Sequence, residues 1–230
     1  MSAVWPRTRE DLERAQRELA LAASEPWIFR PGAAIGGTFG ASAGEDGPDR
    51  IWAAAVLGPA SAVVRGETGA PYEAGYLALR EGEWLERAVR ALPRLPDVLL
   101  VNATGRDHPR RAGLALHLGA VLDVPTVGVT DRPLLARVQG GGLVLDGEAV
   151  GLLVRTRPGA RPVCAHAAWR TDAATAAEVV RAAAGGSRTP EPIRLARFLA
   201  RSARAIDEGT APPGWQPRVR WQPPPPPRLA

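Results

Sequence analysis

The stretch DVLLVNATGRDHPRRAGLALHLGAVLDVPTVGVT, residues 97–130, decides the fold of this 230-residue chain. Its ends, DVLLVN and PTVGVT, are short apolar runs rich in branched residues, which is typical of buried strands. Between them, residues 109–122 carry the strongly apolar face of a helix. The strand–helix–strand order predicts an α/β domain. The turn after the first strand opens with Asn102, at the sheet edge where such folds gather catalytic groups.

The segments before this unit predict one helix, three strands and another helix. Residues 8–23 have apolar side chains at helical spacing, after a capping-box pattern that begins at Thr8. The glycine-rich run 33–42 predicts a strand that ends in a tight turn, and residues 51–58 and 61–68 predict two more. These three strands suggest an antiparallel meander. Residues 75–92 again have helical spacing.

The segments after the unit complete a mixed sheet. Residues 142–156 predict a hairpin around Asp146-Gly147. Residues 161–166 predict a possible further strand, on which Cys164 and His166 share one face and pack in the core. Helices are expected over 171–184 and 192–206. We expect one α/β domain, with flanking helices on a mixed sheet, over residues 1–208.

Residues 209–230 end in WQPPPPPRLA and predict a proline-rich tail that is disordered or extended. Such a tail could bind a protein partner that recognises proline, although a solvated tail is the preferred interpretation.

The composition points to an anionic partner or to a coding bias toward arginine. All 29 basic residues are arginine, and the net charge is +5. Lacking lysine, the chain cannot use a lysine nucleophile. The single cysteine, Cys164, excludes an intrachain disulfide and a cysteine metal cage. No leader or membrane-length apolar run is found, so we expect a cytoplasmic protein without membrane contact. We also expect a monomer.

Several motifs, in order, resemble those of the endonuclease V family. They are PYEAGYLALREGEWL (71–85), the stretch 97–119, LDVPTVGVT (122–130), GLLVRTRPGARPV (151–163) and TPEPIRLARFLA (189–200). The resemblance covers nearly all of residues 1–205. It implies a ribonuclease-H-like fold and an enzyme of repair that nicks DNA or RNA near deaminated purines.

The resemblance also implies a carboxylate cluster that holds Mg²⁺ for phosphodiester hydrolysis. Here Glu81 matches the family's glutamate, but Phe39 and Asn102 occupy the other two ligand positions. Three further family residues are replaced: a lysine by Asp131, and two histidines by Thr104 and Trp169. We therefore expect impaired catalysis, with Mg²⁺ as cofactor only if activity remains and otherwise none.

The resemblance further implies a surface that binds nucleic acid. Tyr72 matches an aromatic wedge that fills the gap left by an extruded base, although it could be an ordinary loop tyrosine. Ala103 replaces a glycine and would crowd the base pocket. The candidate contacts to nucleic acid are Tyr72, Gly105, His108, Arg110, Arg111, Arg155 and Arg157, with Arg161 near the last two. They predict weak binding to DNA or RNA.

Two alternatives stay open. The chain could be an active nuclease with a rearranged metal site, in which Asp107 and Asp131 join Glu81 and His108. It could instead be a protein-interaction module that uses the proline-rich tail and exposed tryptophans. The leading hypothesis is a nucleic-acid-binding homologue with a degenerate metal centre.

Overall fold

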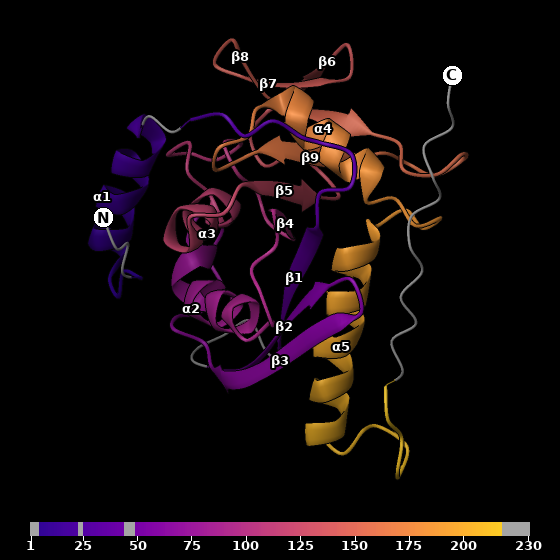
Figure 1. Ribbon diagram of the computed structural model, residues 1–230. Helices are drawn as coiled ribbons and strands as arrows, with labels where there is room; N and C mark the ends of the chain where they lie inside the picture. Colours follow the sequence, from indigo (N-terminus) through magenta and orange to yellow (C-terminus); the bar gives the residue numbers. More distant parts are fainter. Residues whose placement is uncertain (1–4, 23–24, 44–48, 218–230) are drawn as a thin grey trace.

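A nine-stranded sheet flanked by helices organises the chain. The computed structural model describes residues 5–22, 25–43 and 49–217 (Figure 1). The strands are β1 (Ile35–Ser42), β2 (Arg50–Leu57), β3 (Ala60–Glu67), β4 (Val98–Val101), β5 (Thr126–Thr130), β6 (Arg137–Gln139), β7 (Gly142–Leu145), β8 (Glu148–Val154) and β9 (Val163–Ala167). The helices are α1 (Arg9–Leu21), α2 (Leu77–Arg90), α3 (Leu114–Leu122), α4 (Ala173–Ala182) and α5 (Glu191–Asp207).

The strand order, β3-β2-β1-β4-β5-β9-β8-β7-β6, makes the sheet mixed. The three central strands β1, β4 and β5 are parallel, with Thr38 opposite Val101 and Val101 opposite Gly128. All other pairs are antiparallel. The predicted fold class and meander are confirmed. Because β1, β4 and β5 run the same way, their carboxyl ends meet at one edge.

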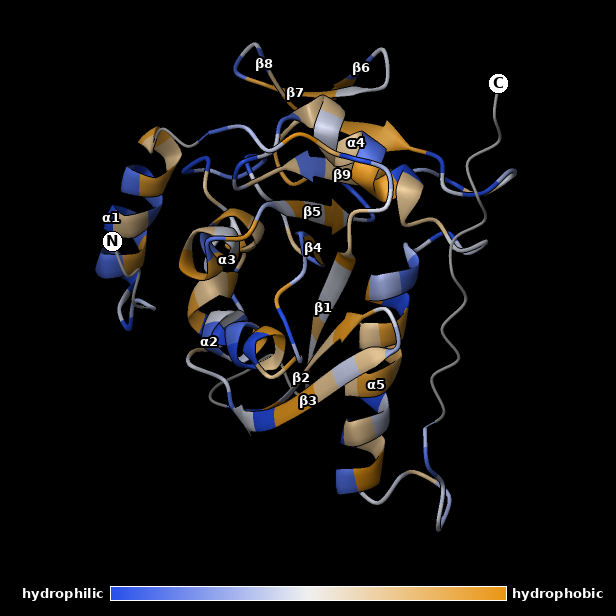
Figure 2. Ribbon diagram, in the orientation of Figure 1, coloured by the Kyte–Doolittle hydropathy of each residue, from blue (hydrophilic) through white to orange (hydrophobic). Residues whose placement is uncertain are grey.

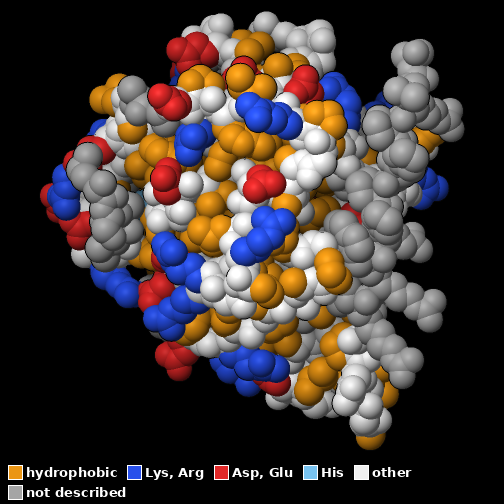
Figure 3. Space-filling model, in the orientation of Figure 1, with side chains coloured by type: hydrophobic (Ala, Val, Ile, Leu, Met, Phe, Trp, Pro, Cys, Tyr) orange, Lys and Arg blue, Asp and Glu red, His pale blue; other side chains and the backbone are white. Residues whose placement is uncertain are grey.

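Helices cover both faces of the sheet. The helices α1, α2 and α3 lie on one face, and α4 and α5 lie on the other (Figure 1). Their apolar sides turn toward the sheet, where β4 is completely buried (Figure 2). Both Cys164 and His166 are buried on β9, as expected. Charged side chains of both signs are interspersed on the outside (Figure 3).

Local signals placed most elements correctly. Thr8 caps α1 by accepting a hydrogen bond from the Asp11 backbone N–H at 3.1 Å. The hairpin turn has left-handed backbone at Asp146 and Gly147, with φ of 50° and 83°. The strand β6 is an addition that the sequence did not predict.

The helix expected over residues 109–122 begins five residues later, at Leu114. Arg111 adopts a left-handed φ of 56°, which a helix cannot include. The Gly113 N–H donates to the Gly105 carbonyl at 2.8 Å, so the segment before α3 folds as a compact turn. That turn forms one side of the candidate site.

The predicted domain boundary lies next to the end of α5, whose C-cap is Glu208. Residues 209–217 continue beyond it, and the Trp215 ring contacts Phe198 edge-on at 6.1 Å between centroids. The rest of the predicted tail, 218–230, lies outside the described residues. No helix within the described ranges is long and apolar enough to cross a membrane.

Candidate functional site

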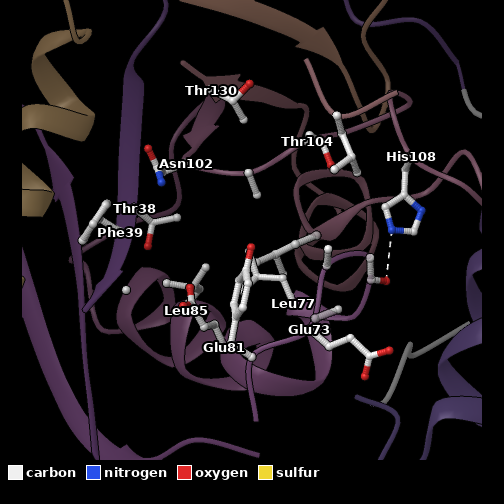
Figure 4. Close-up of a pocket in the computed structure, with 18 of the residues that line it drawn as sticks. Thr38, Phe39, Glu73, Leu77, Glu81, Leu85, Asn102, Thr104, His108 and Thr130 are labelled. Carbon is white, nitrogen blue, oxygen red and sulfur yellow. Dashed lines mark hydrogen bonds between the residues drawn. The ribbon is translucent and has the colours of Figure 1, made fainter. Parts of the chain in front are cut away.

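A pocket of about 330 Å³ opens at the carboxyl ends of β1 and β4 (Figure 4). Its walls come from these strand ends, from α2, and from the loop that precedes α2. The residues most relevant to chemistry are Thr38, Gly40, Tyr72, Glu81, Asn102, Thr104, His108 and Thr130. The predicted edge of the sheet therefore does carry a hollow lined with polar groups.

Alternate residues of β1 face opposite sides of the sheet, so Thr38 and Gly40 share one face, although Phe39 also lines the pocket. A Cβ atom on Gly40 would fall 2.7 Å from Glu81 Oε2, whereas one on Gly37 would strike α5 at Pro192. The Phe39 side chain lies on the α5 side, where it packs with the core beneath that helix. The match of Phe39 to the family's first carboxylate position stays a prediction, and the structure adds that Thr38, its neighbour on β1, also lines the pocket.

Thr38 offers the site little chemistry of its own. It is fully buried, and its hydroxyl donates to the Ala54 carbonyl on β2 at 2.9 Å. That hydrogen bond uses the only proton of the side chain. Thr38 therefore adds a neutral hydroxyl group to this side of the pocket and no carboxylate.

Glu81 is one of two carboxylates that line the pocket, and α2 directs it toward β1 (Figure 4). Burial raises the pKa of Glu81 to about 7, because the charged form loses water, and the nearby Arg80 charge only partly opposes this. No described residue donates a hydrogen bond to the carboxyl group. Glu81 can therefore exchange a proton near neutral pH, but it lacks the partners that would hold it ionised.

Asn102 at the end of β4 is paired with an arginine that the sequence did not single out. Its Oδ1 accepts a hydrogen bond from Arg197 Nη2 at 3.1 Å. The guanidinium group of Arg197 lies over the Phe39 ring, 5.1 Å from its centroid. A cation from α5 therefore occupies the neighbourhood of the second missing carboxylate.

These residues do not fit a magnesium site. Mg²⁺ requires oxygen ligands, usually with at least one or two carboxylates among them. In the described ranges, no three His, Cys, Asp or Glu side chains come together in a way that could hold a metal ion. The other acid in the pocket wall, Glu73, forms an ion pair with Arg9. Thr38, Gly40 and Asn102 add no negative charge.

The rearranged carboxylate set is not assembled either. Asp107 is fully buried and accepts backbone hydrogen bonds from Leu134, Leu135 and Ala136 at 2.8–2.9 Å. Asp131 is exposed and binds Arg188 at 2.5 Å. The structure therefore commits both acids elsewhere, and the grouping with Glu81 and His108 is wrong.

His108 and Gly105 belong to the loop that precedes α3, and His108 lines the pocket. His108 is buried, and its Nε2–H donates to the Gly75 carbonyl at 3.1 Å while Nδ1 accepts from the Arg110 backbone N–H. Burial lowers the pKa of His108 to about 4, so the ring is neutral. A Cβ on Gly105 would lie 2.1 Å from the Ala167 carbonyl oxygen. Both residues therefore hold backbone in place, a role the motif did not reveal.

The two arginines expected to bind phosphate are engaged inside the protein. Arg110 donates to Gln16 Oε1 at 2.6 Å and to the Gly75 carbonyl at 2.8 Å, and it stacks on the Tyr76 ring. Arg111 donates to Glu148 at 2.9 Å and to the Leu145 carbonyl at 3.1 Å. Both guanidinium groups therefore already have partners within the chain, and their contact with phosphate stays a prediction.

The second predicted arginine cluster remains on the surface. Arg155 and Arg161 are exposed, although Arg155 donates to the Ala160 carbonyl. Arg157 is exposed as well. Tyr72 lies at the rim of the pocket with 54% of its surface exposed, as a wedge would require.

The two residues that replace family histidines, Thr104 and Trp169, lie in different parts of the structure. Thr104 lines the pocket, and its backbone carbonyl accepts from the Ala115 N–H at 3.1 Å. Trp169 packs against the core beside α3, with its indole nitrogen buried. The structure thus brings Glu81, Asn102, Thr104 and Tyr72 together and places Trp169 elsewhere.

Comparison with known proteins finds relatives that are endonucleases V. The family model of endonuclease V matches residues 52–198. An endonuclease V of Methanopyrus kandleri is 44% identical over 156 residues, which span 64% of this chain and 67% of that protein. An endonuclease V of Roseiflexus castenholzii is 37% identical over 179 residues, or 72% and 81% of the two chains.

Solved structures of endonuclease V are similar in fold to this chain. The endonuclease V of Streptomyces avermitilis is 31% identical, with a TM-score of 0.74 over 90% of this chain and 96% of that one. The Ciona intestinalis endonuclease V, solved with a 24mer DNA containing an inosine followed by a ribo-adenosine, shares the fold. It has a TM-score of 0.74 at 22% identity, over 86% and 98% of the chains. The expected ribonuclease-H-like fold is confirmed.

Proposed function

Because the chain belongs to the endonuclease V family, we propose that it binds nucleic acid at this pocket but does not cleave it. The Ciona intestinalis relative, solved with inosine-containing DNA, supports a nucleic-acid partner. The loss of cleavage is argued from the residues of this chain alone. The protein then acts as a binding or regulatory member of its family in the handling of deaminated nucleic acid.

One observation carries the proposal: Glu81 faces Thr38 and Gly40 across the pocket, with Asn102 beside them (Figure 4). Hydrolysis of a phosphodiester by divalent metals depends on several negative oxygens that hold the ions against the phosphate. A single carboxylate whose pKa is raised to about 7 is half protonated at neutral pH. It cannot replace a cluster.

The pocket is suited to hold a base that has left its stack. Its volume of about 330 Å³ is at the lower end of the range for small-ligand sites. Tyr72 stands at the rim, where its ring can stack on a neighbouring base. The Ala103 methyl group adds bulk to the wall, so we expect little preference for hypoxanthine over other bases.

The decisive experiment is a nicking assay on inosine-containing DNA and RNA with Mg²⁺ and with Mn²⁺. We expect no product above background, and the Glu81→Gln variant should be indistinguishable from the wild type. Metal-dependent nicking that disappears in Glu81→Gln would overturn the proposal, because it would show that this carboxylate still supports hydrolysis. Binding is measured in parallel with the same oligonucleotides, so that an inactive but competent protein is recognised.

A further inference from the structure

The outer side of α5 carries a second hollow of about 340 Å³, here called the α5 groove. It is lined by Arg194, Arg197, Phe198, Arg201, Ser202, Ala205 and Trp215. Three of these residues are arginines at helical spacing, so their guanidinium groups lie along one side of the helix. The groove therefore combines concentrated positive charge with two aromatic rings.

The charge in the groove is incompletely neutralised. Arg194 pairs with Glu191 at 2.5 Å, but no described carboxylate forms a salt bridge with Arg197 or Arg201. Both guanidinium groups instead lie over the Phe39 ring, at 5.1 and 5.9 Å from its centroid. Two like charges held on one ring repel each other, and a bound anion would relieve that repulsion.

Arg197 has unused hydrogen-bonding capacity. Burial, and next the positive charge of Arg201, lower the pKa of Arg197 from its ordinary value. Its Nε is buried and has no partner among the described residues, while its Nη2 donates to Asn102. Leaving a buried donor unpaired is costly, so an oxyanion in the groove that reached this guanidinium group would reduce that cost.

The aromatic pair is exposed beside these cations. Phe198 and Trp215 meet edge-on and keep 36% and 38% of their surfaces exposed. Rings next to arginines form the arrangement that single-stranded nucleic acid uses, with bases stacked on rings and phosphates on cations. Carboxylates in a protein partner would satisfy the arginines but would leave these two rings without a flat surface to stack on.

The α5 groove adjoins the pocket of the proposed function. Asn102 and Phe39 both line that pocket, and both contact Arg197. A strand with one base in the pocket can therefore place a neighbouring phosphate on Arg197 and Arg201. We propose that the α5 groove binds the flanking single strand of DNA or RNA, through phosphate at Arg197 and Arg201 and through a base stacked on Phe198 and Trp215. This inference rests on the proposed binding function.

The test uses the full-length protein and two fluorescent ten-nucleotide probes, one of deoxyadenosine and one of abasic sugar phosphate. Fluorescence anisotropy across a range of salt concentrations gives affinity and its salt slope. Arg201→Ala should weaken binding of both probes and lower the slope by about 0.7. Arg94→Ala, which removes the same charge beside β4 at its amino end, should have little effect.

The aromatic half of the groove is tested with Trp215→Ala and its conservative partner Trp215→Phe. Trp215→Ala should weaken binding of the deoxyadenosine probe by about tenfold and leave binding of the abasic probe unchanged, because only a base can stack on the ring. Trp215→Phe should restore most of the loss. Circular dichroism confirms that these surface variants are folded.

The outcomes separate the two proposals. If Tyr72→Ala weakens binding but Arg201→Ala and Trp215→Ala match Arg94→Ala, the groove is refuted and the pocket stands. If the groove variants weaken binding and Tyr72→Ala does not, the groove stands and the pocket is refuted. If the wild-type protein binds neither probe at low salt, both proposals are refuted.

Discussion

An oxygen atom of Glu81 lies in close approach to Gly40, next to the point where a side chain on that residue would begin. A Cβ on Gly40 would be only 2.7 Å from Glu81 Oε2, so a larger residue at position 40 would require the Glu81 carboxyl group to move. The absence of a side chain at residue 40 gives the carboxyl group its room under β1. The same closeness shows that Gly40 lies on the side of β1 that faces Glu81.

Adding carboxylates should create metal binding only on the side of β1 that faces Glu81. In Thr38→Asp with Asn102→Asp, two new carboxylates face Glu81, and we expect isothermal titration to detect weak Mn²⁺ binding. The matched control is Phe39→Asp with Asn102→Asp, whose first carboxylate would point toward α5. We expect no binding there, and equal binding by both folded variants would contradict the alternation deduced for β1.

Removing the Glu81 charge should stabilise the protein in alkaline solution. The folded state keeps the Glu81 proton up to about pH 7, whereas the unfolded state releases it near 4.5. The free energy of unfolding is therefore highest below pH 4.5 and falls as the pH rises to 7. Relative to wild type, Glu81→Gln should gain on the order of 2 kcal/mol between pH 4.5 and 8, since the carboxyl group borders an open pocket.

Urea denaturation at these two pH values measures the difference. Glu178→Gln, on the exposed side of α4, is the control for loss of a carboxylate. A gain for Glu81→Gln that did not change with pH would show that the carboxyl group titrates normally.

Replacing His117 should relieve a sensitivity to acid. His117 stacks under Trp5 with ring centroids 4.7 Å apart, and its Nδ1 is buried without a partner. Burial lowers its pKa to about 4, so folding disfavours the protonated ring and stability is lost as the pH falls from about 6.5 toward 4. His117→Phe keeps a stacked ring, and it should stabilise by about 1 kcal/mol at pH 7 and by more at pH 5.

Thermal or urea unfolding at both pH values checks this expectation. His108 and His166 are also buried with pKa values lowered to about 4, so some acid sensitivity should persist in the variant. If His117→Phe were less stable than wild type at pH 5, the unpaired nitrogen would not be a cost to the fold.

Truncating Arg110 should loosen the rim of the pocket. Its guanidinium group ties Gln16 of α1 to the Gly75 carbonyl in the loop that carries Tyr72. Arg110→Ala leaves both oxygens without this donor, and we expect faster hydrogen exchange of the backbone amides of residues 72–76. Arg157→Ala, on an exposed loop, is the control and should leave the exchange unchanged.

The sequence predicted what depends on local patterns and missed what depends on side-chain direction. The strands around residues 97–130, the meander and the hairpin follow from short runs of branched residues and turn glycines. In β1, glycines at 36, 37 and 40 fall on both faces, so no alternation of apolar and polar residues marked which face is inward. Phe39 and Thr38 could not be told apart for that reason.

The destinations of arginines were equally hidden. Arg197 meets Asn102 across 95 positions of the chain, and Arg110 meets Gln16 across 94. A flexible charged side chain looks the same in sequence whether it is solvated or tied to a distant oxygen. Only the packing of α1 and α5 on the two faces of the sheet decides between these states.

The tie between Arg110 and Gln16 has a consequence for how the protein is divided. Sequence similarity to the family model begins at residue 52, after both α1 and β1. Yet β1 supplies Thr38 and Gly40 to the pocket lining, and Gln16 of α1 accepts a hydrogen bond from Arg110 at the rim of the pocket. A fragment that began at residue 52 would keep the motifs that the family model matches. It would lose α1 and β1, which hold those motifs in place. The pocket of this chain therefore depends on more residues than the family model matches.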